Sequence, residues 1–400
     1  MRHTLVLFHR YVGLAIALFI AVAGLTGSIL AFNHEIDAWL NPEFYQVEGV
    51  GEPLPPGEII SQVEAKYPDI WVWYLGYPEE PGDPAILFAS PRINPETGED
   101  YDNAYNFFSW DAVTGEEVGK RYWMNCCFEP ENFIPFVYEL HHNLLLPEHF
   151  GILLMGIVAI LWVLDTLISL FLTFPRNGPF FSKWWRFWKI KGGSTMRLNL
   201  DWHRAGGLWL WLILLPVAIS SVAMNLPTQV FKPVVSVFSP VALSMYEERL
   251  ATPVDERGET RITHHQAYQL GLAEAKRLGW DEPVGEYLYL KDENYFGVGF
   301  GYHDGNLLGN KWIYFEGTEG RQIGVKIPGE GTAGDVFADL QLPIHGGRIA
   351  GLPGRIIIFI TGLGLVMLSG TGVYIWWRKR KARLSSRQKQ SSATASAELS

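Results

Sequence analysis

Histidine is the residue type in this sequence with the clearest capacity for chemistry, and its eleven copies are unevenly placed. Six of them lie at the ends of long apolar stretches: His9, His34, His141, His142, His203 and His345. A neutral imidazole nitrogen is a common metal ligand, and two of them can fill both axial positions of a haem iron to form an electron-transfer centre. A histidine at a helix end can also be a simple interfacial polar residue. Which of these two roles applies depends on the helices that carry the histidines.

The apolar residues are concentrated in four stretches, and the charged residues lie between them. The stretches are 1–34, 149–175, 202–226 and 353–378. Each holds a run of about 20 apolar residues, the length that crosses a bilayer core as a helix. The sequence therefore predicts an integral membrane α-helical protein with four transmembrane helices, for which the lipid bilayer is the first partner.

Basic residues give the orientation of these helices. The connection 176–201 is rich in Lys and Arg, and Arg378 to Arg383 follow the last stretch directly. By the positive-inside rule, both termini, the 176–201 loop and the Ser/Ala-rich tail 379–400 are cytoplasmic, and we expect the tail to be disordered. The segments 35–148 and 227–352 then lie outside. The net charge of −10 argues against nucleic acid as a partner.

The two halves of the chain repeat one another. Residues 9–14 and 203–208 both read His-Arg-x-x-Gly-Leu at the start of a predicted span. Each outer segment begins with an amphipathic helix and continues with short aromatic-rich strands. It then has a strand–turn–strand and a histidine before the next span. In the first half these parts are the helix 58–67, the turn with Asp111 and Gly115, and His141. In the second half they are the helix 264–278, the turn with Glu316 and Gly320, and His345. This internal duplication predicts a pseudo-twofold axis along the membrane normal.

The order of these motifs resembles that of the PepSY-associated transmembrane proteins. The resemblance covers nearly the whole chain except the tail, and it is strongest to the ferric-siderophore reductase branch of the bacterial inner membrane. It implies two periplasmic α+β PepSY-like domains, over 35–148 and 227–352, and b-type haem. It also implies an oxidoreductase that works in iron uptake. PepSY domains occur in peptidase propeptides too, so the domain type alone does not fix a function.

The predicted axis pairs the candidate haem ligands. Symmetry-related residues face one another across such an axis, so we expect His9 with His203 near the cytoplasmic leaflet and His141 with His345 near the outer leaflet. That arrangement predicts two haem b groups. His34 and His142 are the alternatives to His141 at the outer site.

Glycines and arginines accompany the inner pair. Gly13 and Gly207 each lie four residues after a candidate ligand, on the same helix face, where a missing side chain leaves room for a flat macrocycle. Arg10 and Arg204 are positioned to neutralise haem propionates. The alternative interpretation is that the glycines serve helix packing and the arginines only obey the positive-inside rule.

Asp165 lies deep in the second apolar stretch, where a carboxylate is costly and usually functional or paired. Three roles fit it: accepting a hydrogen bond from a ligating imidazole, capping a water chain, or remaining protonated at a helix interface. The adjacent Cys126 and Cys127 fit either a vicinal disulfide or a tight turn.

These expectations combine into a transmembrane electron conduit that reduces an Fe(III)-siderophore in the periplasm and releases Fe(II). Siderophores are hard oxygen ligands that hold Fe(II) far less tightly. No strand–GxGxxG–helix nucleotide motif is present, so the donor on the cytoplasmic side is expected to be a reduced flavin, a quinol or a partner reductase. Periplasmic siderophore-handling proteins are further candidate partners. The rival interpretations are a haem-free protein that binds or regulates a periplasmic peptidase, a permease, and a b-type cytochrome with another acceptor.

Overall fold

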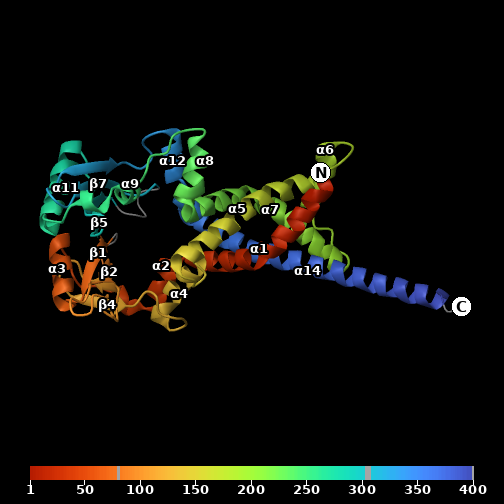
Figure 1. Ribbon diagram of the computed structural model, residues 1–400, viewed down its shortest axis with the longest axis horizontal. Helices are drawn as coiled ribbons and strands as arrows, with labels where there is room; N and C mark the ends of the chain where they lie inside the picture. The colour runs from red at the N-terminus through yellow and green to blue at the C-terminus, as the bar shows by residue number, and fades with distance from the viewer. Residues whose placement is uncertain (79–81, 302–307, 399–400) are drawn as a thin grey trace. The chain divides into compact units, whose positions relative to one another are not determined.

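The computed structural model describes residues 1–78, 82–301 and 308–398 (Figure 1). The chain forms two compact units, each built from separate stretches of sequence. The helical unit contains residues 1–32, 137–231 and 344–400, and the sheet unit contains residues 33–136 and 232–343. Each unit is described by itself.

Four long apolar helices dominate the helical unit. They are α1 (Arg2–Leu30), α5 (Glu148–Thr173), α7 (Thr195–Asn225) and α14 (Gly351–Glu398). Each is long and apolar enough to cross a membrane. The four predicted spans are therefore confirmed as helices of the required length and composition.

These four helices pack in a closed cycle (Figure 1). α1 packs against α14 and α5, and α7 packs against the same two helices, so α1 and α7 lie at opposite corners. α1 and α14 approach especially closely at Gly24 and Gly362. A Cβ added to either glycine would collide with the backbone oxygen of the other. Small residues permit this approach of two membrane helices.

Shorter helices of this unit connect the long ones: α6 (Phe180–Trp184) and η2 (Trp185–Trp188) between α5 and α7, η3 (Pro227–Phe231) after α7, and η4 (Arg348–Ala350) before α14. α4 (Pro130–His142) enters the unit at its carboxyl end, and α13 (Gln341–His345) does the same. α7 begins at Thr195, earlier than predicted, because the Ser194 side chain caps its first turn.

The predicted disordered tail, 379–400, differs from the structure. α14 continues as a helix through this region to Glu398, and 399–400 lie outside the described residues. The tail is rich in Ala, Lys, Arg and Gln, which have high helix propensity, and no glycine or proline follows Trp377 to end the helix.

One antiparallel sheet organises the sheet unit. Its strand order is β4-β3-β2-β1-β5-β6-β7-β8. The strands are β1 (Ile70–Gly76), β2 (Ala85–Pro91), β3 (Phe107–Trp110), β4 (Glu117–Arg121), β5 (Val284–Leu290), β6 (Tyr295–Phe300), β7 (Lys311–Glu316) and β8 (Gln322–Lys326). The order is the same when read outward in either direction from the β1–β5 pair.

The two predicted outer domains therefore share one sheet. β1 and β5 pair over Tyr74 to Gly76 and Glu286 to Leu288, which joins the four strands of each half. A separate four-stranded sheet in each half would leave the edges of β1 and β5 without partners, and pairing satisfies both edges at once.

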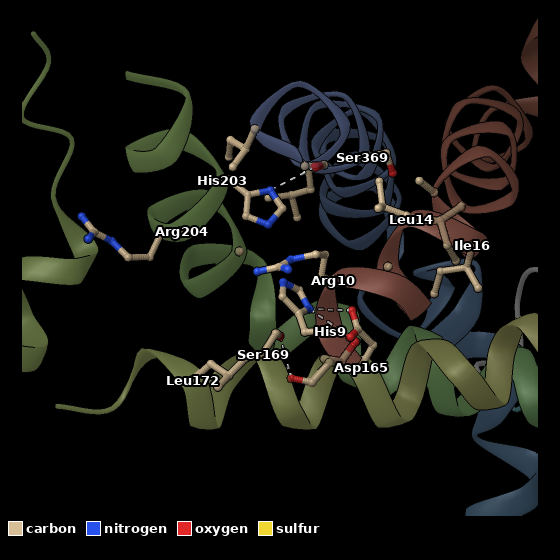
Figure 2. Close-up of a pocket in the computed structure, with 18 of the residues that line it drawn as sticks. His9, Arg10, Leu14, Ile16, Asp165, Ser169, Leu172, His203, Arg204 and Ser369 are labelled. Carbon is tan, nitrogen blue, oxygen red and sulfur yellow. Dashed lines mark hydrogen bonds and ion pairs between the residues drawn. The ribbon is translucent and has the colours of Figure 1, made fainter. Parts of the chain in front are cut away.

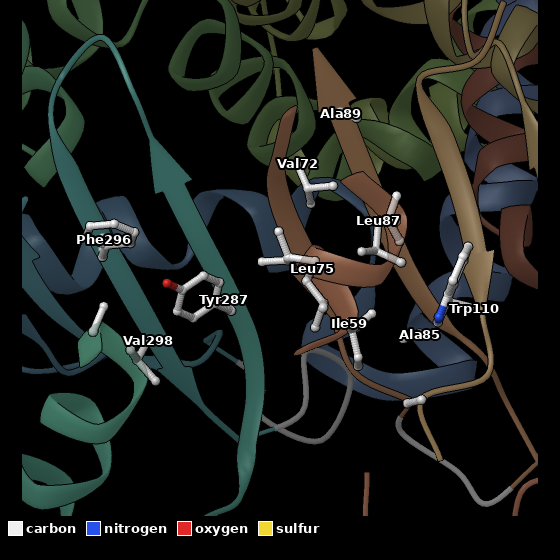
Figure 3. Packing of buried hydrophobic residues seen from close by; sticks show 14 of the residues in the cluster. Ile59, Val72, Leu75, Ala85, Leu87, Ala89, Trp110, Tyr287, Phe296 and Val298 are labelled. Atoms are coloured by element: carbon white, nitrogen blue, oxygen red, sulfur yellow. The ribbon is translucent and has the colours of Figure 1, made fainter. Parts of the chain in front are cut away.

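α3 (Pro56–Lys66) and α11 (His264–Leu278) cover one face of this sheet. Figure 3 shows the resulting core, in which Ile59, Val72 and Leu87 from the first half lie in the same cluster as Tyr287 and Val298 from the second. The cluster is continuous across the β1–β5 pair, so one hydrophobic core serves both halves.

The predicted strand–turn–strand is confirmed in both halves. Gly115 and Gly320 adopt the left-handed φ values of 78° and 74°. The Asp111 carboxylate accepts hydrogen bonds from the backbone N–H of Val113 and Thr114, and Glu316 accepts from the residues at the same place in its own turn. Glycine is the residue that takes this conformation without strain.

The remaining helices of the sheet unit are short: α2 (Asn33–Leu40), η1 (Pro42–Phe44), α8 (Lys232–Ser236), α9 (Met245–Ala251), α10 (Val254–Arg257) and α12 (Ala333–Asp339). α2 is fixed by a fully buried ion pair, because both terminal nitrogens of Arg121 donate to Asp37, at 2.9 and 2.6 Å. Cys126 and Cys127, in the loop before α4, are joined as a vicinal disulfide.

Candidate functional site

Two pairs of histidines lie inside the helical unit. His9 on α1 and His203 on α7 have ring centroids 6.1 Å apart, with their planes inclined by 46°. His141, at the end of α4, and His345, at the end of α13, have centroids 6.0 Å apart and an inclination of 66°. The structure thus brings together the two pairs that the sequence repeat predicts.

His9 is held by the carboxylate of Asp165, which lies toward the carboxyl end of the membrane helix α5. Its Nδ1 lies 2.9 and 3.0 Å from the two carboxylate oxygens of Asp165. An ionised carboxylate only accepts hydrogen bonds, so His9 donates through Nδ1–H, and in the neutral imidazole Nε2 then keeps its lone pair. This hydrogen bond to an imidazole is the contact that the first of the three roles for Asp165 requires, and ligation by that imidazole stays a prediction.

His203 is fixed in the same tautomer by α14. Its Nδ1 lies 3.1 Å from the backbone oxygen of Leu368 and 3.1 Å from the Thr371 hydroxyl. The carbonyl oxygen can only accept, and the Thr371 hydroxyl already donates to the backbone oxygens of Met367 and Leu368. Nδ1 therefore carries the proton. Figure 2 shows the His203 and His9 rings pointing toward one another, with each Nδ1 turned to its hydrogen-bond partner.

The spacing of both pairs matches that of two axial ligands on one metal ion. An imidazole nitrogen binds a first-row metal at about 2.0–2.1 Å and lies about 1.1 Å from its own ring centroid, so two opposed ligands have centroids about 6.3 Å apart. The observed 6.1 and 6.0 Å are close to this value. Within the described residues no group of three or more His, Cys, Asp or Glu side chains is arranged to hold a metal ion.

A cavity of about 400 Å³ adjoins the inner pair and is lined by His9, His203, Gly13, Gly207 and residues of all four long helices. This volume lies in the range of about 300–1,000 Å³ that is usual for small-molecule and cofactor sites. Both glycines line this cavity, and a Cβ at Gly13 or Gly207 would meet Asp165 or Leu368 at an ordinary van der Waals distance of 3.7 or 3.9 Å, so neither position requires glycine for close helix packing. The structure thus favours the cavity interpretation for both.

Neighbouring glycines behave differently. A Cβ at Gly206 would lie 2.8 Å from the end of the Met367 side chain, and one at Gly372 would lie 3.2 Å from the His203 ring. Gly206 and Gly372 therefore serve close packing, although Gly372 also lines the cavity.

The two predicted arginines take different positions. Arg10 lines the cavity, and Figure 2 shows its guanidinium near the His9 ring. Arg204 borders the cavity through its stem, but its guanidinium donates to Asp201 at 2.9 Å and lies over the Phe187 ring. Of the two, Arg10 is therefore the one available to an anionic group in the cavity, together with Lys379, which also lines it.

Hydroxyl groups hold the outer pair. His141 Nδ1 lies 2.9 Å from the Thr26 hydroxyl, and His345 Nδ1 lies 3.0 Å from the Ser220 hydroxyl. Each hydroxyl donates to a carbonyl of its own helix, of Val22 or Val217, and so accepts from the imidazole. The lone pair of Nε2 is again left free in both rings.

Thr26 and Ser220 occupy matching places in the repeat. Ser220 follows Thr26 by 194 positions, which is also the separation of His203 from His9 and of Gly207 from Gly13. The sequence analysis missed both hydroxyl residues. Their signal was present in the aligned halves, since a small hydroxyl residue stands seventeen places after each inner histidine.

The two alternative outer ligands contact tyrosines. The His34 ring packs edge-on against Tyr45 at 5.3 Å, within the sheet unit. The His142 ring lies 5.6 Å from Tyr138, whereas the ring of its neighbour His141 faces His345. The geometry therefore favours His141 over both alternatives.

The two pairs lie at opposite ends of the long helices. His9 precedes Thr26 by seventeen residues on α1, a rise of roughly 25 Å at 1.5 Å per residue. The hydrocarbon core of a bilayer is about 30 Å thick. Between the pairs lies a buried apolar cluster centred on Ile16, Ile20, Val158, Leu214 and Leu365.

Fold and site together define a four-helix membrane protein with paired, hydrogen-bonded histidines at both ends of its helical bundle and an antiparallel sheet unit. A family model described as the PepSY-associated TM region matches residues 6–379. The chain therefore belongs to that family, as its motifs suggested. No curated protein matches the chain.

Proposed function

We propose that this protein is a haem-containing oxidoreductase of the bacterial inner membrane that passes electrons across the bilayer. In this proposal it reduces an Fe(III)-siderophore in the periplasm and releases Fe(II). The termini are cytoplasmic and the sheet unit is periplasmic, as the basic flanks of the helices favour. The observation that carries the proposal is the pair of opposed histidines near each end of the bundle, 6.1 and 6.0 Å between centroids.

The residues present fit a haem b at each pair. Four imidazoles have Nδ1 engaged and Nε2 free, and the spacing of both pairs suits two axial ligands. At the inner pair, Gly13 and Gly207 line the cavity, and Arg10 supplies a cation for an acidic substituent. Haem would supply a one-electron carrier when bound, and His9 with His203 and His141 with His345 are the residues that would hold it.

The protein groups then have three tasks. The hydrogen bonds to Asp165, Leu368, Thr26 and Ser220 fix each imidazole ring and its tautomer. The apolar cluster between the pairs keeps water out of the bilayer core. The two pairs lie roughly 25 Å apart, so one carrier at each pair leaves a step shorter than the whole bilayer, which is about 40–45 Å thick with its headgroups.

The electron balance is simple. A two-electron donor on the cytoplasmic side, either a reduced flavin, a quinol or a partner reductase, delivers its electrons singly and reduces two Fe(III)-siderophores, one electron each. The donor's protons remain on the side where it is oxidised. Fe(II) then leaves, because the hard oxygen ligands of a siderophore hold it far less tightly than Fe(III).

Proteoliposomes test this proposal. Vesicles with the purified full chain would carry a reduced flavin or quinol inside and a ferric hydroxamate siderophore with an Fe(II)-specific chromophore outside. We expect Fe(II) to form only with the wild-type protein, and His203→Ala and His345→Ala should each stop it by breaking one end of the path. Reduction of other acceptors but not of the ferric siderophore would favour a b-type cytochrome with another partner. A protein without haem would favour the peptidase-binding alternative.

A further inference from the structure

The four histidines differ in the group that accepts their Nδ1–H. His9 donates to the carboxylate of Asp165, and His203 donates to a backbone carbonyl and a hydroxyl. His141 and His345 donate to the hydroxyls of Thr26 and Ser220. The inner pair therefore includes one carboxylate partner, whereas both partners of the outer pair are hydroxyls.

This difference breaks the repeat at one position. His345 follows His141 by 204 positions, and the same separation from Asp165 leads to Ser369 on α14. Ser369 also lines the inner cavity, but the group that holds His203 is the backbone oxygen of Leu368 with the Thr371 hydroxyl. The second half thus provides no carboxylate where the first half has Asp165.

We propose that Asp165 gives the inner haem site the lower reduction potential of the two and so sets the direction of electron flow from the cytoplasmic to the periplasmic side. This inference rests on the proposed function. Asp165 acts as a positioning residue, because it touches the ligand His9 and not the reacting iron. Its charge is also the only one among the four sets of imidazole partners.

The chemical reason is the electron donation of the imidazole. A carboxylate that accepts the Nδ1–H bond makes the ring a stronger base at Nε2, which stabilises the ferric state relative to the ferrous state. A hydroxyl acceptor does this less, since it carries no charge. The bond has the usual hydrogen-bond length, at 2.9 and 3.0 Å to the two carboxylate oxygens, and the Asp165 side chain is 13% exposed, so solvent screens it little.

Cations near the inner site act in the opposite direction. Arg10 and Lys379 line the same cavity, and positive charge favours the ferrous state. Asp165 acts through the ligand itself at hydrogen-bond distance, so we expect its effect to be the larger. One electron then passes from the inner to the outer site with a favourable free energy, the inner site being oxidised by one electron and the outer reduced by one.

The test is a redox titration, followed by the absorption of the reduced haem, of the purified full chain and of Asp165→Asn. Asparagine keeps an oxygen that accepts the hydrogen bond but removes the charge. We expect two components in the wild-type protein. In Asp165→Asn the lower component should rise by at least about 59 mV, which is a tenfold change in electron distribution for a one-electron couple. His345→Ala removes the outer site, so the single component that remains in its redox titration is that of the inner site.

Asp201→Asn is the matched control. Asp201 is a fully buried carboxylate on α7 that pairs with Arg197 and Arg204 and contacts no histidine. We expect it to move the lower potential clearly less than Asp165→Asn does, and an equal shift would overturn the inference, because the effect would then be one of general charge. Two haems with equal potentials, or an inner haem of higher potential, would also overturn it while leaving the proposed function intact. A wild-type protein without haem would instead refute the proposed function. If His345→Ala does not fold, the titrations of the wild-type protein and of Asp165→Asn, which both keep two haems, still show which of the two components changes its potential.

Discussion

Filling the inner cavity from Gly207 should remove one haem without unfolding the protein. A Cβ at Gly207 meets its nearest neighbour, Leu368, at an ordinary van der Waals distance of 3.9 Å, so Gly207→Leu adds its side chain at the cavity lining without a backbone clash. Four carbon atoms, each about the size of a water molecule of about 30 Å³, fill about 120 Å³ of the 400 Å³ cavity. A packed macrocycle cannot lose nearly a third of its space, because well-packed sites accommodate extra atoms only with strain.

The assay is haem per chain after purification, with thermal unfolding measured on the same samples. We expect about two haems in the wild-type protein and about one in Gly207→Leu, since the outer histidine pair is untouched. Gly370→Leu is the matched control, because Gly370 lies on the same helical unit and a Cβ there would contact nothing within 4 Å, and it does not line the cavity. Full haem content in Gly207→Leu would refute the assignment of the cavity to the cofactor. Equal haem loss in Gly370→Leu would show that any bulky substitution disturbs the bundle.

Three further predictions concern residues outside the inner site. His34→Ala and His142→Ala should keep the full haem content, because both rings contact tyrosines, and loss of haem in either would contradict the assignment of the outer pair. Arg121→Met should destabilise the sheet unit by about 3–5 kcal/mol, because it leaves Asp37 buried without its partner, and adding Asp37→Leu should recover part of this loss in thermal unfolding. Burial, with a smaller effect of Arg92, lowers the pKa of His264 to about 4. Its contribution to stability is therefore complete above about pH 6.5 and is lost as the pH falls toward 4. His264→Gln should weaken this pH dependence of the melting temperature, and an unchanged profile would count against it.

The sequence was sufficient for the four membrane-length helices and for the inner histidine pair, whereas it left His34 and His142 as alternatives at the outer pair and missed the helical tail. Apolar length alone identifies the four spans. The repeat pairs His9 with His203 because both open the same motif, and the structure brings them to 6.1 Å. The turn glycines Gly115 and Gly320 were predictable for a local reason, since their positive φ depends on the turn itself.

Long-range partners were harder to predict. Nothing in the local pattern of β1 or β5 states that the two strands pair, so the sequence suggested two domains where the structure has one sheet. Thr26 and Ser220 were missed because a hydroxyl residue in a membrane helix commonly bonds its own backbone, as both also do here. The role of Asp165 had three alternatives until its distance to His9 was known.

The most direct test of the central claim is an absorption spectrum of the detergent-purified protein, before and after reduction with dithionite, with haem quantified per chain. We expect sharp reduced bands of b-type haem and about two haems per chain, one for each histidine pair. The absence of a Soret band in protein produced with ample haem would contradict the account and leave the four histidines without the role assigned to them.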